Sequence, residues 1–201
     1  MTVSQAPSLA MKFSRIESRF RDPEFLTGRG ISNEVPFYVF SYDAAEENEV
    51  RVRTAELIDA SRAGQIPARI VPMDLWDIFC DICAYYDIVD DLDRMEQARG
   101  SEALLAHIRE LAMPEDYIRT MRERYERDFG AVQRGRDVLL VTGVGKVYPF
   151  VRAHDILENA QPAFDSIPLV LFYPGQYDQQ SLRLFNSVAD GNYYRAFTII
   201  D

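Results

Sequence analysis

The amino-acid sequence predicts an α/β fold: a mostly parallel five-stranded sheet flanked by helices. Short runs rich in β-branched and aromatic residues, apolar along their whole length, alternate with segments whose apolar residues recur at helical spacing. Continuously apolar strands are typical of parallel sheets buried on both faces. The chain has 201 residues, of which 47% are apolar. This length and composition suit one domain with a sizeable core, and we expect residues 1–201 to form it.

Five strands are expected, each ending near Gly, Pro or Asp residues. They lie at 35–42, 68–72, 137–142, 168–173 and 194–200. The run at 35–42, VPFYVFSY, is β-branched and aromatic throughout and indicates a strand buried on both faces.

The segments between the strands show helical spacing. Leu9, Phe13, Ile16 and Phe20 recur at intervals of four, three and four residues, which places them on one face of a helix. A second helix is expected over 49–63. Asp74 is placed to cap a helix that begins at Leu75 and carries its apolar stripe on to Val89. Helices over 101–112 and 114–130 then complete a helical insertion of about 75–133.

Charge is unevenly distributed. There are 22 Lys plus Arg and 32 Asp plus Glu, giving a net charge of −10, which argues against a surface that broadly coats DNA or anionic membrane. Residues 74–96 hold eight acidic residues and one Arg, whereas 119–136 hold six Arg and three acidic residues. Each segment is either a solvated helix face or a docking face. The candidate basic patch consists of Arg119, Arg122, Arg124, Arg127, Arg134 and Arg136.

The sequence also indicates a compartment. Two cysteines are too few for a disulfide framework, which favours a reducing environment. The first eight residues are polar and resemble no signal peptide, and the longest apolar runs are too short to cross a bilayer. We therefore expect a cytoplasmic protein without membrane contact.

The segment Thr142–Val147 follows a strand and invites comparison with phosphate-binding loops. A Walker loop needs a Gly five residues before its Gly-Lys pair and a hydroxyl after it, but Leu140 and Val147 occupy those places. Tyr148 stands where a dinucleotide loop would have its third Gly. The prediction is a P-loop-NTPase-like or Rossmann-like fold without a working phosphate loop.

Other constellations favour structural roles. Cys80 and Cys83 lie within an amphipathic helix, where packed thiols are expected because a zinc site needs four ligands. The acidic run from Asp87 to Asp93 lacks the ligand order and turn Gly of a calcium loop and is expected to be solvated. His107 is interpreted as structural, and His154 pairs at helical spacing with Glu158 only. No metal or cofactor is expected.

The carboxyl ends of the strands are where open parallel sheets bind ligands and partners. Together with residues from the sequence blocks described next, they supply the candidate functional or interaction residues. For most of them a structural role at a turn or strand end is the alternative, but Arg152 and His154 are favoured as functional, because a polar pair after a strand end has less reason to lie in the core. These candidates are Asp43, Asp74, Lys146, Tyr148, Arg152, His154, Tyr173, Tyr177 and Arg195.

Four sequence blocks are unusual in combination: NEVPFY at 33–38, GVGKVYPFVRAH at 143–154, FYPGQY at 172–177 and NYYRAF at 192–197. In order and spacing they resemble the BrxB family of the bacteriophage exclusion (BREX) defence systems. In that family an acidic residue is common where Lys146 stands, so this chain departs from the pattern there. The resemblance implies a cytoplasmic role in phage defence, no established enzymatic activity, and a protein partner within the system, above all the alkaline-phosphatase-like PglZ.

Three hypotheses follow. The leading one is a non-catalytic adaptor that binds PglZ or another BREX component. The second is a cryptic nucleotide-binding or hydrolytic enzyme at the sheet edge that uses Asp43, Asp74, Arg152 and His154. The third is a DNA-binding accessory factor that uses the arginines between Arg119 and Arg136. The net charge makes DNA contact plausible only within a complex.

Overall fold

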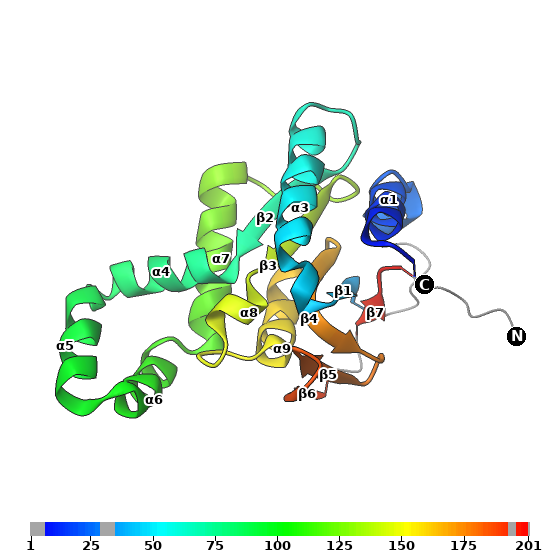
Figure 1. The fold of residues 1–201 in the computed structure, drawn as a ribbon. Helices are drawn as coiled ribbons and strands as arrows, with labels where there is room; N and C mark the ends of the chain where they lie inside the picture. The colour runs from blue at the N-terminus through cyan, green and yellow to red at the C-terminus, as the bar shows by residue number, and fades with distance from the viewer. Residues whose placement is uncertain (1–6, 29–34, 193–195, 201) are drawn as a thin grey trace, which may run out of the picture.

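The computed structural model describes residues 7–28, 35–192 and 196–200 and confirms the α/β fold (Figure 1). Five strands run parallel in the order β2-β3-β4-β1-β7. They are β1 (Phe37–Tyr42), β2 (Arg69–Asp74), β3 (Asp137–Thr142), β4 (Leu169–Tyr177) and β7 (Phe197–Thr198). The bounds of β3 agree with the expected strand, since its apolar run is flanked by polar residues at both ends.

The sheet differs from the prediction at its C-terminal part. Of the expected strand over 194–200, positions 194 and 195 lie outside the described residues, and among the described ones Phe197 and Thr198 form β7. A hairpin of β5 (Ser181–Leu184) and β6 (Val188–Asn192) was not predicted, because both strands are short and mix polar with apolar residues. β4 also runs on past Tyr173 to pair antiparallel with β5, although Pro174-Gly175 resembles a turn.

The helical insertion lies between β2 and β3. It consists of α4 (Leu75–Tyr85), α5 (Val89–Arg99), α6 (Ser101–Leu111) and α7 (Pro114–Phe129). α4 leads away from the sheet, α5 and α6 form the end of the insertion farthest from the sheet, and α7 returns to the sheet (Figure 1). The single helix expected through Val89 is interrupted, because Asp87 adopts φ 53°, which an α-helix cannot accommodate. With α8 (Val144–Val147) and α9 (Ala153–Phe164), α4 and α7 cover one face of the sheet.

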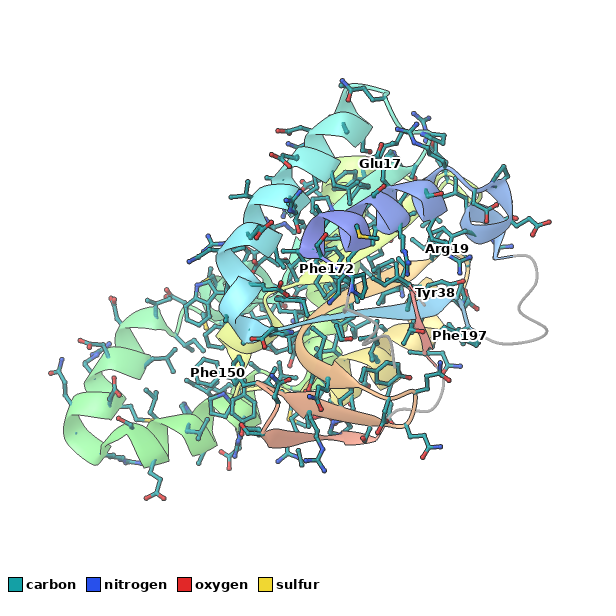
Figure 2. All side chains as sticks on the ribbon, turned by 45° about the vertical axis from the view of Figure 1, so that its right-hand side comes forward. Glu17, Arg19, Tyr38, Phe150, Phe172 and Phe197 are labelled. Carbon is teal, nitrogen blue, oxygen red and sulfur yellow. The ribbon has the colours of Figure 1, made fainter. Side chains whose placement is uncertain are left out.

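The opposite face is covered by α1 (Leu9–Phe20), α2 (Pro23–Thr27) and α3 (Glu47–Arg62). The apolar face predicted for the first helix is confirmed. Phe13 packs edge-on against Phe40 and Phe172 of the sheet, with ring centroids 5.5 and 6.0 Å apart. Phe172 and Tyr38 lie beneath α1 in Figure 2. Both sheet faces are therefore buried, as the continuously apolar strands require.

A buried carboxylate holds the return of the insertion onto the sheet. Asp137, fully buried at the start of β3, accepts hydrogen bonds from Arg69 at 2.6 and 2.8 Å, from the Tyr125 hydroxyl and from the backbone N–H of Gln133. Burial raises the pKa of Asp137, but these donors outweigh that effect and hold it below its usual value. The network joins β2, β3 and α7.

We expect Asp137→Asn to lower the free energy of unfolding by about 3 kcal/mol, because it leaves the Arg69 guanidinium without its carboxylate in a buried network. Chemical denaturation at neutral pH measures this loss. Asp91→Asn, which removes an exposed ion pair with Arg94, is the control and should change little. The wild-type contribution is present above the unfolded-state pKa near 3.8 and is lost as the pH falls through the lower folded-state value. An Asp137→Asn protein that is as stable as the wild type at pH 7 would contradict this role.

Candidate functional site at the carboxyl edge of the sheet

The connections of the sheet create a crevice at its carboxyl edge. β1 leads through a short 3-10 turn, Ala44–Glu46, into α3 on one face, whereas β3 leads into α8 and α9 on the other. Where neighbouring connections diverge to opposite faces, open α/β sheets bind their ligands. Here the divergence lies between the carboxyl ends of β1, β4 and β3.

Two adjoining cavities occupy this position, with volumes of about 250 and 200 Å³. Both are lined by Tyr42, Glu47, Arg51, Gly143 and Lys146. The first also reaches the hairpin residue Phe185 and Pro174 of β4. The second reaches Asp74 of β2 and an apolar floor made by Val50, Ile58 and Phe172. We call these two cavities together the edge crevice.

Asp74 is the hub of the polar side of the edge crevice. As predicted, it caps α4, accepting the N–H of Trp76 at 2.9 Å. Its other oxygen accepts a 2.5 Å hydrogen bond from Lys146 and a weaker one from the Thr142 hydroxyl. Gly143 has φ +82°, and a Cβ there would lie 2.5 Å from the Asp74 carboxylate, so a glycine is required to admit it. The Gly-Lys segment thus fixes Asp74 instead of surrounding a phosphate.

The other wall of the edge crevice comes from β1 and α3. The buried Tyr42 hydroxyl donates a 2.6 Å hydrogen bond to Glu47. The pKa of Tyr42 is raised, mainly by burial and further by the hydrogen bond to this carboxylate. Glu47 is thereby turned toward the strand, although Arg51 lies one helical turn further on. Neither Glu47 nor Arg51 was predicted, since no motif distinguishes them from other charged helical residues.

The turn after β1 is unsuited to holding a pyrophosphate. It contains no glycine, and it carries the acidic residues Asp43, Glu46 and Glu47 in the connection where a first βα turn would hold a pyrophosphate. The side chain of Asp43 is exposed and accepts the N–H of Ala45, so it serves the turn instead of lining the crevice.

A second cluster lies between α9 and the hairpin. Asp190 of β6 is fully buried and accepts the Tyr173 hydroxyl at 3.2 Å and the N–H of Ala153 at 3.3 Å. His154 Nδ1 donates to the Asp190 carbonyl at 2.5 Å, and its Nε2 lies 3.0 Å from Asp155. A Cβ on Gly191 would fall 2.4 Å from His154 Nδ1, so the ring lies directly on that glycine. Within the described residues, Asp190 Oδ1 has no hydrogen-bond partner.

The structure therefore separates the residues of the enzyme hypothesis. Asp74 lies in the edge crevice, His154 is bound in the Asp190 cluster, and Asp43 is an exposed turn residue. Arg152 is exposed at the start of α9. These four side chains do not assemble into a nucleophile with a base and an orienting group. Asp190 was not predicted, because its burial depends on the unforeseen hairpin.

The remaining candidates have structural contacts or lie beyond the described residues. Tyr148 packs half-buried against the core, and the buried Tyr177 hydroxyl donates to the Ala196 carbonyl at 2.7 Å. Arg195 lies outside the described residues.

The cysteines correct one expectation. Cys83 is buried, and burial raises its pKa to about 11, but Cys80 is exposed instead of packed because it points away from the α4 stripe. The pKa of Cys80 is also raised, mainly by burial and further by the negative charges of Asp77, Asp81 and Asp74. A reactive thiolate is therefore disfavoured. Among the described residues, no three His, Cys, Asp or Glu side chains are grouped to hold a metal.

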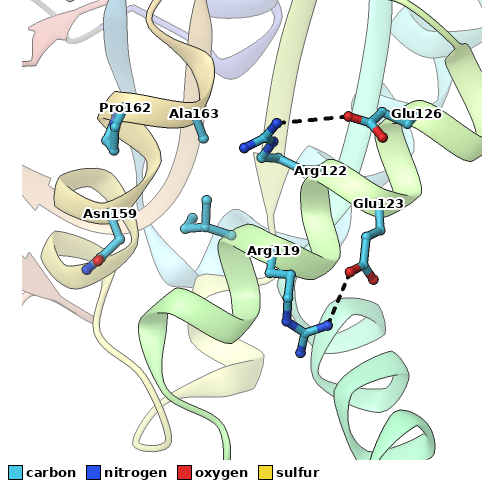
Figure 3. Close-up of a pocket in the computed structure, with 8 residues that line it drawn as sticks. Arg119, Arg122, Glu123, Glu126, Asn159, Pro162 and Ala163 are labelled. Carbon is cyan, nitrogen blue, oxygen red and sulfur yellow. Dashed lines mark hydrogen bonds and ion pairs between the residues drawn. The ribbon is translucent and has the colours of Figure 1, made fainter.

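The candidate basic patch is largely neutralised. Arg119 pairs with Asp116 and Glu123, Arg122 with Glu126, Arg124 with Asp81 and Asp128, and Arg127 with Asp128. Arg136 donates instead to the Gln133 side chain, and Arg134 is exposed. A groove of about 420 Å³ runs between α7 and α9, with Arg119, Arg122 and their glutamates along one wall (Figure 3). Its surface is mixed in charge.

We expect the stability difference between wild type and Asp190→Asn to depend on pH. Burial raises the pKa of Asp190, although the Ala153 N–H, Tyr173, His154 and Arg152 partly offset it. The folded state then binds the proton more tightly than the unfolded state. Wild-type stability falls as the pH rises from the unfolded-state value of 3.8 through the raised folded-state value, by at most about 1.4 kcal/mol per unit. Denaturation of both proteins across pH 4 to 8, at about five values, should show Asp190→Asn gaining relative to wild type. A constant difference would show that Asp190 titrates normally.

Comparison with known proteins identifies the family. The model of the family "BREX protein BrxB" matches residues 71–199. A BREX protein BrxB from Bacillus cereus (strain H3081.97) is 34% identical over 193 residues, covering 94% of this chain and 96% of that protein. One from Escherichia coli O9:H4 (strain HS) is 28% identical over 197 residues, covering 96% and 92%. No solved structure matches. No helix in the described part of the chain has the length and apolarity to cross a membrane. The chain belongs to the BrxB family of the BREX phage-defence system.

Proposed function

We propose that this protein is a non-catalytic, cytoplasmic adaptor of its BREX system and that it binds the PglZ-like component directly. The observation that carries the proposal is the arm formed by the end of α4 together with α5 and α6, which projects from the sheet (Figure 1). None of the 11 residues of α5 is fully buried, and only Leu92, which packs against the core, and Met95 are half-buried. A helix of that length gains its stability mainly from packing, and here the packing on its own chain leaves most of α5 exposed, so its outer face is available to a partner surface.

Large apolar side chains are exposed along this arm and at its base. They are Trp76, Tyr85, Tyr86, Val89 and Met113, whose exposed fractions range from 39% to 69%. Aromatic and Met side chains are enriched at the centres of protein interfaces, where they bury much surface at low entropic cost. We therefore place the partner-binding surface on the arm.

Charge defines the chemistry of the partner. α5 carries Asp90, Asp91, Asp93 and Glu96 against two arginines, and one of these, Arg94, already pairs with Asp91. We therefore expect the partner surface that contacts the arm to be basic around an apolar centre, because like charges facing one another would oppose association.

Two further observations support an adaptor. Both carboxylates that line the edge crevice have partners on this chain: Asp74 pairs with Lys146, and Glu47 accepts the Tyr42 hydroxyl. Four of the six candidate patch arginines have carboxylate partners on this chain. DNA contact is accordingly proposed only through the assembled complex.

The first test is size exclusion with light scattering of this protein alone and mixed with its cognate PglZ-like protein. We expect a discrete heteromeric peak of fixed stoichiometry. Two unchanged peaks at micromolar concentration would remove this pairing and direct the same experiment to the other BREX components.

The second test locates the surface. Val89→Ser combined with Asp90→Lys should weaken the heteromer at least about tenfold, because it removes an exposed apolar contact and reverses a charge. Val89 is 60% exposed and Asp90 is exposed as well, so the thermal melting curve should be unchanged. Val52→Ser, at a 59% exposed valine on α3, is the matched control. Wild-type affinity in the arm variant would exclude the arm as the interface.

A further inference from the structure

We propose that the edge crevice binds a small molecule combining a planar ring with a single anionic group, and that its class is a nucleoside monophosphate. The site lies at the divergence of the sheet connections, where α/β folds bind ligands. Its two cavities, of about 250 and 200 Å³, together match the lower range of small-molecule pockets, which begins at about 300 Å³.

Arg51, which lines both cavities, is the reason for expecting an anionic group on the ligand. Within the described part of the chain, no carboxylate lies within ion-pair distance of its guanidinium. Glu47, four residues before it, is hydrogen-bonded to the Tyr42 hydroxyl instead. Lys146, the other cation of the crevice, is held by Asp74. A guanidinium presents a planar fork of donors that fits a phosphate or carboxylate, and Arg51 offers it unpaired.

Phe185, at the turn of the β5–β6 hairpin, is the reason for expecting a planar ring on the ligand. Phe185 and Asn186 have φ values of 52° and 62°, a conformation that favours Asn and Gly and disfavours a bulky aromatic residue. The Phe185 ring belongs to neither hydrophobic cluster and is 40% exposed. It lines the first cavity, and its ring lies against Gly145, where a Cβ would come within 3.1 Å of it. A strained aromatic residue outside the core, at the edge of a cavity, is suited to stacking on a ligand ring.

The surrounding charges limit the ligand to one anionic group. Asp43, Glu46 and Glu47 lie in the turn that a polyphosphate would have to follow, and that turn has no glycine to let the backbone approach. Only Arg51 offers an unpaired positive charge to the crevice among the described residues that line it. A triphosphate would place its outer phosphates against these carboxylates.

Calorimetric titration of the purified full chain tests the ligand. AMP and GMP should bind with sub-millimolar affinity, and ATP should bind no more tightly than AMP. Adenosine, which lacks the anion, and inorganic phosphate, which lacks the ring, should each bind at least about tenfold more weakly. N-acetylphenylalanine carries a ring and the carboxylate of a peptide end. Binding of that probe without binding of AMP or GMP would overturn the nucleotide assignment in favour of a chain terminus.

Variants test the two assigned residues. Arg51→Ala should weaken AMP binding at least about tenfold without changing the melting temperature, because Arg51 is exposed and unpaired. Arg62→Ala, at an exposed arginine near the other end of α3, is the matched control and should bind AMP as wild type does. Phe185→Gly should abolish AMP binding while raising the melting temperature, since glycine adopts a positive φ without strain.

The Phe185→Gly result separates the two accounts of that ring. A ring with a purely structural role would instead lower the melting temperature when removed and leave AMP affinity unchanged. Amide chemical shifts of the wild-type protein on adding AMP provide a readout independent of any variant and should move at Gly145 and Phe185. Absence of AMP and GMP binding at millimolar concentration, or shifts confined to another surface, would overturn the proposal.

Discussion

The placement of the helical insertion depends on the buried carboxylate of Asp137. The chain leaves the sheet at the end of β2, forms four helices and returns at the start of β3. The two strands can therefore pair in register only if this long connection brings the start of β3 back beside the start of β2. Arg69 and Asp137 are register partners, and their ion pair also holds Tyr125 of α7. At the other end of the same two strands Asp74 stands opposite Thr142 and binds Lys146. Asp137 is fully buried and its oxygens are surrounded by donors, whereas the Asp74 side chain is 23% exposed and lines a cavity. Asp137 therefore stabilises the pairing of β2 and β3 from inside the core, whereas Asp74 stabilises it at an edge that a ligand can reach.

The periodicity of the sequence predicts what depends on local burial. The strand at Asp137–Thr142, the α1 stripe and the cap at Asp74 all follow from residue spacing, because each is set by its immediate neighbours. The break between α4 and α5 could not be predicted, since the apolar stripe continues past Asp87 and only the backbone at that residue interrupts it. The same limit applies to the site. Asp74 and Lys146 stand at strand ends and were identified there, but Arg51, Phe185 and Asp190 acquire their surroundings from a helix face and a hairpin that the sequence pattern does not place.

The arginine-rich segment illustrates how a one-dimensional charge sum differs from a surface. Six arginines between 119 and 136 suggest a basic patch, yet α7 also places carboxylates three or four residues from several of them. At that spacing opposite charges are neighbours on a helix. The arm shows the converse: its acidic residues outnumber its basic ones, so its negative charge persists at the surface and remains available for steering a basic partner.

The two proposed sites are joined by α4. Its first turn is capped by Asp74, which lines the edge crevice, and its last turn carries Tyr85, whose ring stacks with the Arg119 guanidinium at 4.7 Å. A helix of 11 residues is a stiff element about 16 Å long. A ligand in the crevice that drew Lys146 away from Asp74 would alter the N-terminal cap of α4. A resulting tilt of α4 would change the position of the arm. Thermodynamic linkage makes such coupling reciprocal, so a partner that held the arm would change ligand affinity by the same factor. The helix that carries the arm thus provides a physical route by which ligand occupancy and partner binding influence each other.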